Sequence, residues 1–266
     1  MKKNVRSLGR QERIMSLLAE AEAVSVSDLA RQLNVSGWTV RRDLSALEAR
    51  GLLERRYGEA QRLESSYRPP VGVTVELSPR TLAAKRRIGR AVARTVQSGQ
   101  HLALSAGTTT TEVARALRER NTPCFVVTNA LNIASELAAA KSIRVTCTGG
   151  EVDGDYETLN GPVAERVLRG HFFDLAIIGV SGIAPAEGLT VDSQLNAVAL
   201  DTMVQHAKRV VVAADHTKFG AVRFAHLAPL AVVDVLVTDG RPEDALLERL
   251  RDHSSEIVVA ADAGAS

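Results

Sequence analysis

The sequence is poor in cysteine and has no long apolar segment. Its two cysteines, Cys124 and Cys147, stand in apolar or β-branched stretches, which argues against a disulfide framework or a metal site and predicts two small core residues. No apolar run approaches the roughly 20 residues that a membrane-spanning helix requires. The basic start of the chain is not followed by the apolar stretch of a secretion signal. These absences lead us to expect a cytoplasmic protein without a membrane partner.

The whole chain has little net charge, but its first quarter has an excess of basic residues. The formal net charge is +2, yet residues 1–68 carry 13 Lys and Arg against 9 Asp and Glu. The remaining residues carry 20 against 22. A basic excess confined to one segment is typical of a domain that binds nucleic acid. A length of 266 residues with 45% hydrophobic residues is sufficient for two domains.

Three short amphipathic helices are expected between Arg10 and Gly51. Ser25 or Ser27 can cap the second helix, and Ser36 can cap the third. The inward-facing residues recur at helical spacing: Ile14, Leu17 and Leu18; Val26, Leu29, Ala30 and Leu33; Val40, Leu44 and Leu47. Helices this short are stable only when they share one small core.

The outer face of the third helix carries groups suited to DNA. Trp38, Thr39, Arg41 and Arg42 follow a cap and a turn of a few residues, which is the helix-turn-helix pattern. Arginine can form two hydrogen bonds with guanine, threonine can contact a phosphate or a thymine methyl group, and Gly37 lets the backbone approach a phosphate. An isolated Arg-Arg pair is usually a solvated face, but here it coincides with a cap, a turn and three core stripes. Two roles stay open for Trp38, which are packing within the domain and contact with the DNA groove.

Charged residues around this helix are expected to act in two ways. Residues 52–58 predict a two-stranded wing whose arginines face the DNA backbone. Asp43 is expected to pair with an arginine of its own domain, because phosphates repel a carboxylate. The residues that we expect to contact DNA are Ser36, Gly37, Trp38, Thr39, Arg41, Arg42, Arg55 and Arg56.

Residues 34–44, NVSGWTVRRDL, with Leu47-Glu48 and Gly51-Leu52, resemble the DeoR family of transcriptional regulators, whose VSxxTIRRDL stretch forms the recognition helix. The resemblance implies a winged helix-turn-helix that binds a double-stranded DNA operator, most commonly as a repressor. The wing departs from the family. Where relatives usually have His-Gly-Gly-Ala, this chain has Tyr57-Gly58-Glu59-Ala60, with an acid in place of a flexible glycine.

A second domain with a different pattern follows. Residues 63–80 contain prolines and no periodicity, which predicts a linker between a winged helix-turn-helix domain over 1–62 and a domain over 81–260. The expected strands are Leu102–Ser105, Phe125–Thr128, Ile143–Thr146, Leu175–Gly179, Val210–Ala214 and Val232–Thr238. Short apolar strands separated by helices predict an α/β domain with a mostly parallel sheet covered on both faces.

Polar segments follow several of these strands, at the edge where ligands bind in such sheets. Ser105 to Thr111 leads into a helix, and a glycine followed by hydroxyls at a helix N-terminus can bind an anion or simply cap the helix. The other segments are Thr128-Asn129, Gly149-Gly150 and Asp215 to Lys218. Their convergence on one edge favours a pocket.

This half also resembles the DeoR family, in its C-terminal sensor domain, which is related in fold to ribose-phosphate isomerase. Similarity runs from Lys85 to Gly240 and includes Gly188-Leu189-Thr190 and Lys218-Phe219-Gly220. The resemblance implies a small, phosphorylated, sugar-type effector, with loop 107–110 as phosphate site and Lys218 as counter-charge. The expected effector-binding residues are Ser105, Gly107, Thr108, Thr109, Thr110, Asn129, Gly150 and Lys218.

Three positions depart from the family in the expected pocket. Ser105 replaces a common aspartate, and Asn196 and Leu200 stand where relatives tend to carry glutamate and lysine. Serine both donates and accepts hydrogen bonds, whereas a carboxylate only accepts them. We therefore expect an altered effector, less hydroxylated or differently phosphorylated.

Two other functions stay open beside the regulator. An isomerase- or transferase-like enzyme would need a carboxylate base or nucleophile, but the acidic residues and histidines show no catalytic or metal-ligand spacing. We therefore expect no catalytic residue, metal or cofactor. The second alternative is a DNA-binding architectural protein whose larger domain only oligomerises. Symmetric assemblies commonly read operators, so we expect a homo-oligomer.

Overall fold

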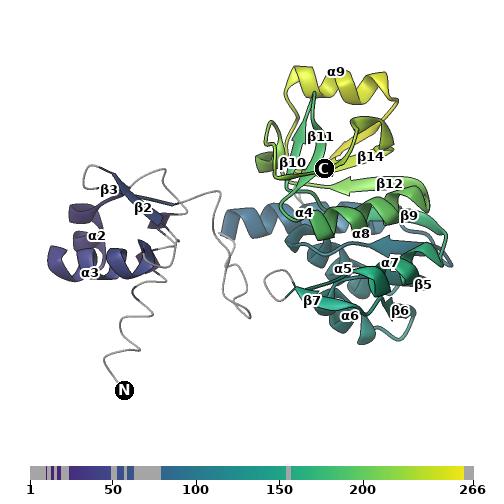
Figure 1. Ribbon diagram of the computed structural model, residues 1–266, viewed down its shortest axis with the longest axis horizontal. Helices are drawn as coiled ribbons and strands as arrows, with labels where there is room; N and C mark the ends of the chain where they lie inside the picture. Colours follow the sequence, from purple (N-terminus) through teal and green to yellow (C-terminus); the bar gives the residue numbers. More distant parts are fainter. Residues whose placement is uncertain are drawn as a thin grey trace. The chain divides into compact units, whose positions relative to one another are not determined.

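The computed structural model describes residues 24–48, 53–56, 59–62, 79–153 and 157–260, together with Arg10, Arg13, Ile14, Leu17 and Leu18. The chain divides into two compact units, Met1–Ser78 and Pro79–Ser266 (Figure 1). The expected linker 63–80 lies outside the described residues except for its last two, Pro79 and Arg80, which begin the first helix of the second unit.

Two helices and a small sheet are described in the first unit. The elements are β1 (Val24–Ser25), α2 (Val26–Gln32), α3 (Gly37–Glu48), β2 (Leu53–Arg56) and β3 (Glu59–Arg62). The strands pair antiparallel in the order β1-β3-β2, and the pairing of β2 with β3 confirms the predicted wing. The turn of the wing and the side chains of Arg55 and Arg56 lie outside the described residues.

Serine caps begin both helices, as predicted. Ser25 Oγ accepts a hydrogen bond from the backbone N–H of Asp28 at 3.1 Å, and Ser36 Oγ accepts one from Thr39 at 3.3 Å. Between the helices, Asn34 has a φ of 50°, in the left-handed region that asparagine tolerates better than most residues. This residue lets the chain turn within a few positions.

One apolar cluster joins these elements. The predicted inward face of α3 is buried, and it contacts α2 and the segment of the predicted first helix. The fully or almost fully buried members are Ile14, Leu18, Leu29, Val40, Leu44 and Leu47. So few apolar residues make each one important for the stability of the unit.

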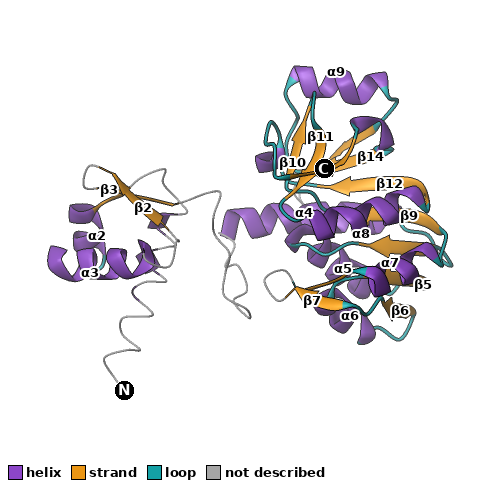
Figure 2. Ribbon diagram, in the orientation of Figure 1, coloured by secondary structure: helices purple, strands orange, loops and turns teal. Residues whose placement is uncertain are grey.

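Seven parallel strands form the main sheet of the second unit (Figure 2). Their order is β15-β14-β12-β9-β4-β5-β6. The strands are β4 (His101–Leu104), β5 (Cys124–Thr128), β6 (Ile143–Cys147), β9 (Phe173–Ile178), β12 (Ala207–Ala213), β14 (Val235–Thr238) and β15 (Glu256–Val259). All six predicted strands and the predicted parallel α/β fold are confirmed, and β15 is additional.

Helices cover both faces of this sheet. They are α4 (Pro79–Thr95), α5 (Thr108–Arg120), α6 (Leu131–Ala138), α7 (Pro162–Arg169), α8 (Gln194–Gln205) and α9 (Asp244–Asp252), with the 3-10 helices η1 (His216–Lys218) and η2 (Leu230–Val232). One apolar cluster contains α4, α5 and α6, and a second contains α7, α8 and α9. Leu175 and Ile177 of β9 belong to the first cluster and Ala176 and Ile178 to the second, as alternation along a strand requires.

A small antiparallel sheet and a hairpin were not predicted. β10 (Gly182–Ala184), β11 (Gly188–Val191) and β13 (Ala225–Ala228) pair in the order β10-β11-β13, and β7 (Glu151–Asp153) pairs with β8 (Thr158–Asn160). Figure 1 shows the small sheet beside α9, at the end of the unit opposite β6 and α6. These strands have three or four residues each, and none of them stands in a long apolar run of the kind that predicted the strands of the main sheet.

The prediction of two core cysteines is correct for Cys124 and wrong for Cys147. Cys124 is buried, and this burial raises the pKa of its thiol to about 11. Cys147 is exposed because it ends β6, the outermost strand of the sheet. An edge strand has a neighbouring strand on one side only, so less of its surface is covered.

Replacing Leu44 by alanine is expected to lower the free energy of unfolding of the first unit by about 2–5 kcal/mol, because a buried leucine leaves a cavity in a small core. Urea denaturation followed by circular dichroism measures the loss. Ser45→Ala is the matched control, since Ser45 is the exposed neighbour of Leu44 in the same helix. Equal losses in the two variants would contradict the described packing of α3.

Candidate functional site

The exposed face of α3 carries the residues predicted to contact DNA. Trp38 is 66% exposed, Arg41 and Arg42 are exposed, and Thr39 is partly buried. The hydroxyls of Ser36 and Thr39 lie 2.9 Å apart in a hydrogen bond that closes the first turn. Within the described residues, neither arginine forms an ion pair. Two cations on a helix with a buried opposite face are therefore free to meet an anionic partner.

A hollow of about 510 Å³ lies where α2 and α3 begin. It is lined by Ser25, Val26, Ser27, Ala30, Gly37 and Arg41. A Cβ atom at Gly37 would lie 3.8 Å from Val26 and 4.0 Å from Arg41, which are ordinary contacts, so the hollow also has room for a small side chain at this position. Hydroxyls, a guanidinium and accessible backbone are the groups that bind phosphate oxygens in protein–DNA complexes.

Asp43 has the internal role that the sequence predicts. It is 1% exposed, and its Oδ2 accepts a hydrogen bond from Nε of Arg10 at 2.5 Å. The same hydrogen bond raises the pKa of the Arg10 guanidinium above its ordinary value. The partner lies 33 residues away in the sequence. The carboxylate therefore connects the buried side of α3 to the predicted first helix, whereas the two arginines lie on the exposed side.

In the second unit, the ends of separate strands bring predicted effector residues together. Ser105 follows β4, and its Oγ accepts a hydrogen bond at 3.0 Å from the backbone N–H of Gly179, which follows β9. Asn129 follows β5, and its Oδ1 accepts one from Ala106 at 3.3 Å. Both side chains are fully buried. Their described contacts hold the strand ends in place around the start of α5.

The loop from Gly107 to Thr110 has mixed exposure. Gly107 and Thr108 are exposed, whereas Thr109 and Thr110 are buried. Gly107 has a φ of 140°, and its carbonyl oxygen accepts a hydrogen bond from Thr110 Oγ1 at 2.9 Å. Gly107 is also the N-cap of α5 and supplies no capping side chain. The first backbone N–H groups of a helix in this state attract anions.

Lys85 and Asp215 form a buried ion pair behind this loop. Lys85 of α4 is 3% exposed, and its Nζ lies 2.6 Å from Asp215 Oδ2 and 3.1 Å from Thr109 Oγ1. Burial by itself raises the pKa of the Asp215 carboxyl, but the charge and hydrogen bond of Lys85, with that of Thr217, outweigh it and lower the pKa to about 2. The Asp215 carboxyl is therefore charged at neutral pH. The sequence did not single out Lys85 as a site residue.

Lys218 lies close to this pair. It ends η1, where it is partly buried, and burial, with the charges of Lys85 and Arg223, lowers the pKa of its ammonium despite the opposing charge of Asp215. Within the described part of the chain, the Lys218 side chain makes no hydrogen bond or ion pair. A cation in this state attracts an anion.

Arg223 is a second cation at this place that the sequence did not reveal. Its backbone N–H donates to Thr190 Oγ1 at 3.0 Å, and its Nε donates to the carbonyl oxygen of Ser181 at 3.3 Å. Both partners border or belong to the unpredicted small sheet. These hydrogen bonds attach the segment that carries Lys218 and Arg223 to the small sheet. No local sequence pattern indicates this contact.

The positions that depart from relatives lie in different environments. Asn196 is partly buried in the first turn of α8, and its Oδ1 has no hydrogen-bond partner among the described residues. Leu200 is fully buried in the apolar cluster of α7, α8 and α9. A Cβ atom on Gly150 would lie 2.4 Å from the carbonyl oxygen of Asn160. Gly150 is therefore required by the close approach of two backbone segments.

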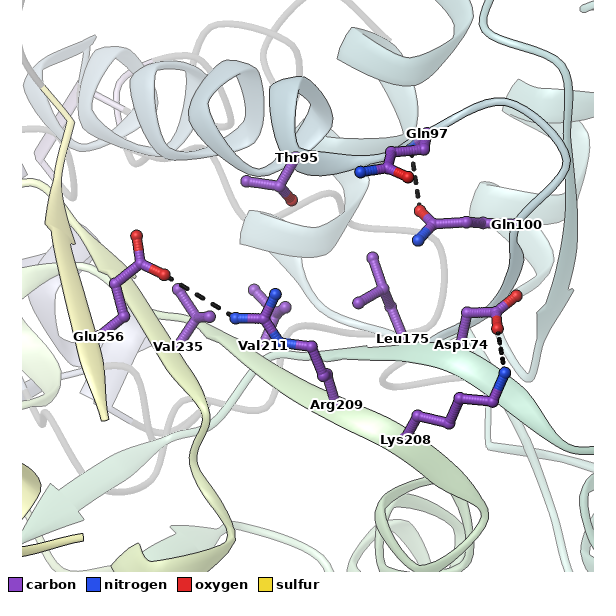
Figure 3. A pocket seen from close by; sticks show the side chains of 10 residues that line it. All are labelled: Thr95, Gln97, Gln100, Asp174, Leu175, Lys208, Arg209, Val211, Val235 and Glu256. Carbon is purple, nitrogen blue, oxygen red and sulfur yellow. Dashed lines mark hydrogen bonds and ion pairs between the residues drawn. The ribbon is translucent and has the colours of Figure 1, made fainter. Parts of the chain in front are cut away.

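A separate cavity of about 240 Å³ lies where the strands begin, away from the predicted effector residues (Figure 3). Lys208 Nζ lies 2.8 Å from Asp174 Oδ1, and Arg209 is 3.8 Å from Glu256. A backbone hydrogen bond from His101, with the hydrogen bond and charge of Lys208, lowers the pKa of Asp174 to about 2. The charged residues of this cavity thus pair with one another, which makes it a weaker anion site than the edge at Gly107.

The sequence is similar to known families in both units. Residues 10–66 match the DeoR-like helix-turn-helix domain, and residues 80–240 match the DeoR C terminal sensor domain. The putative aga operon transcriptional repressor of Escherichia coli O157:H7 is 32% identical over 94% of this chain and 93% of its own length. The glycerol-3-phosphate regulon repressor of Escherichia coli K12 is 28% identical over 93% of this chain and 97% of its own.

Solved structures give a partial likeness. Ribose 5 phosphate isomerase A from Neisseria gonorrhoeae has a TM-score of 0.39 and 14% identity over 53% of this chain and 54% of that chain. No helix in the described ranges has the length and apolarity to cross a membrane. Nor do the described residues contain three or more His, Cys, Asp or Glu side chains grouped to hold a metal ion.

Replacing Asp215 by asparagine is expected to destabilise the second unit by about 3–5 kcal/mol at neutral pH, because Lys85 is left buried without a counter-charge. Asp215 stays charged to about pH 2 in the folded chain, but it is protonated near pH ~4 in the unfolded chain. The stabilisation it contributes is complete above about pH 4 and is lost as the pH falls towards 2.

The difference in unfolding free energy between the native chain and Asp215→Asn should therefore shrink by ~2 kcal/mol over that window. Urea denaturation at a series of pH values measures it. Asp252→Asn is the control, since Asp252 is exposed at the end of α9. A difference that stays constant down to pH 2 would contradict the ion pair.

Proposed function

Because this chain belongs to the DeoR family of transcriptional regulators, as both halves of its sequence predict, we propose that it is a repressor of a double-stranded DNA operator whose binding is controlled by a small phosphorylated metabolite. The relatives above are named as repressors, one of them of a glycerol-3-phosphate regulon. The first unit binds DNA in this proposal, and the second unit binds the metabolite.

Contact with DNA is assigned to α3 and to the hollow beside it. The N-terminal turns of a recognition helix enter the major groove, and here they carry Trp38, Thr39 and the two arginines, which form no ion pair with any described residue. Arg41 lines the hollow with Ser25 and Ser27, which supports a role in binding a phosphate of the DNA backbone. Arg55 and Arg56 of the wing stay a prediction. A symmetric homo-oligomer would present two such helices to the half-sites of an operator.

Binding of the metabolite is assigned to the edge between Gly107 and Lys218. The observation that carries this assignment is the partly buried ammonium of Lys218, which has no hydrogen bond or ion pair among the described residues and is affected by the charge of Lys85, whose Nζ contacts Thr109 at the uncapped start of α5. Lys85 contacts both Thr109 of the loop and Asp215, and Lys218 senses the charges of Lys85 and Asp215, so all these groups share one neighbourhood. A phosphate group would supply the missing negative charge.

The second unit is proposed as a sensor rather than an enzyme. Asp215 is the buried carboxylate of this neighbourhood, but its oxygens already bond with Lys85 and Thr217, and its pKa is about 2. A carboxylate with so low a pKa is a poor general base at neutral pH. The chemistry of the edge therefore suits binding of an anion better than proton transfer.

Arg41→Ala is expected to weaken binding to specific and non-specific duplexes alike, and to reduce the slope of log affinity against log salt by about 1, the effect of one lost phosphate contact. Fluorescence anisotropy with the DNA upstream of the protein's own gene, and with an unrelated duplex, measures both quantities. Arg94→Ala removes an exposed cation from the second unit and should change neither. An unaltered salt slope in Arg41→Ala would remove Arg41 from the interface.

Lys218→Ala is expected to weaken binding of phosphorylated ligands about 10- to 100-fold, because a charge-assisted hydrogen bond to a buried anion is lost. Thermal shift with triose, pentose and hexose phosphates, the matching unphosphorylated sugars and inorganic phosphate measures the effect. Lys141→Ala, an exposed lysine elsewhere, is the control. Equal stabilisation of both variants by every sugar phosphate would contradict the assignment.

The same panel separates the remaining alternatives. Preferential stabilisation by the less hydroxylated phosphates would agree with the altered effector that Ser105 and Asn196 predict. Chromatography of the incubated mixtures should return each compound unchanged, and an isomerised product would favour an enzyme instead. Anisotropy of the upstream DNA with and without the stabilising compound then tests whether the metabolite controls DNA binding.

A further inference from the structure

An indole is the exposed large apolar side chain among the described residues of α3. Trp38 is 66% exposed and is the one tryptophan of the chain. It stands second in the helix, among the residues that reach base edges when a recognition helix enters the major groove. The apolar cluster of the unit forms without it. The indole is exposed to water on this turn, so its apolar surface is buried only when a binding partner covers it.

Arg42 is stacked on this indole. Its guanidinium carbon lies 5.3 Å from the centre of the Trp38 ring, within the range of a cation–π contact, and the two residues are one helical turn apart. Stacking restricts a planar group that would otherwise rotate freely, so less entropy is lost when it forms two hydrogen bonds with a base.

The two arginines of the motif therefore occupy different places. Arg41 lines the hollow where α2 begins, whereas Arg42 lies over Trp38 on the first two turns of α3. The hollow offers hydroxyls for a phosphate, but the indole offers an apolar edge. In the major groove, the apolar group of a base pair is the C5-methyl of thymine, and the preferred partner of an arginine fork is guanine.

We propose that Trp38 and Arg42 act as one reading unit, in which Arg42 bonds to a guanine while the edge of Trp38 covers the methyl group of a neighbouring thymine. The inference rests on the proposed DNA-binding function and adds a specific sequence preference to it. Arg41 contributes affinity for the DNA backbone, and the Trp38–Arg42 unit contributes discrimination between bases. A contact to a methyl group is neutral, so it alters specificity without altering the dependence of binding on salt.

The experiment begins with selection of bound duplexes from a random-sequence pool by the full-length protein. In the selected consensus, each thymidine is then replaced in turn by deoxyuridine, which lacks only the methyl group. The replacement is expected to weaken binding about fourfold at one position of the half-site, the cost of a methyl group withdrawn from an apolar contact. This position should adjoin a guanine.

Trp38→Ala should bind the consensus about 5- to 150-fold more weakly, the size of one lost base contact, and should no longer distinguish thymidine from deoxyuridine there. Its binding to unselected duplexes, and the salt slope, should equal those of the native chain. Arg42→Lys keeps the charge but loses the stacked fork, and should relax the preference for the adjoining guanine. Phe172→Ala removes an exposed aromatic side chain from the second unit and is the matched control.

Emission of Trp38 gives a readout that needs no variant. Because the chain has one tryptophan, a shift to shorter wavelength and protection from acrylamide in the complex with the consensus duplex report on this side chain alone. Unchanged emission, or a Trp38→Ala protein that selects the same consensus with the same affinity and thymidine preference, would overturn the inference while leaving the proposed function intact. A native protein that binds no duplex would overturn both.

Discussion

The buried ion pair of Lys85 with Asp215 is the contact on which the arrangement of the second unit's binding edge depends. Neither charge is tolerated alone in an apolar interior, so the two must meet once the helices cover the sheet. Lys85 is 24 residues from Thr109 and 130 residues from Asp215, yet it contacts both. One ammonium group thus joins the first helix of the unit, the start of α5 and the end of β12. The pair holds these elements in a single position.

The charge that this ion pair does not neutralise determines the chemistry of the binding edge. Asp215 is fully engaged by Lys85 and Thr217, so it offers little negative charge to its surroundings. Among the described residues, the Lys218 side chain has no hydrogen bond or ion pair, and it is affected by the charge of Lys85, which contacts the start of α5. The first backbone N–H groups of that helix also attract anions. A satisfied buried pair beside an unsatisfied cation favours binding of a small anion over acid–base chemistry, which would require a carboxylate with a raised pKa.

The first unit also combines a buried ion pair with cations that are available to an outside partner, in this case DNA. Asp43 is buried and accepts a hydrogen bond from Arg10, and among the described residues it forms no ion pair with either arginine of the recognition helix. Arg41 and Arg42 therefore keep their charges for an outside partner, and their surroundings divide them into one group suited to phosphate and one suited to a base. Rigid packing on one side of a short helix is what allows its other side to present charge in a fixed pattern.

The sequence by itself determined the elements whose physical signal is local. Helical spacing, serine caps and apolar runs were sufficient for α2, α3, the wing and six parallel strands, and the order of strands and helices was sufficient for the class of fold. Tertiary structure alone decided which side chains meet: Lys85 with Asp215, Arg10 with Asp43, and Arg223 with the small sheet. Tertiary structure also decided that Cys147 is exposed and Leu200 is buried. The sequence pattern does not show whether a strand lies at the edge of a sheet, or whether another element covers a given helix face. Such contacts join residues far apart in the chain, where periodicity carries no information.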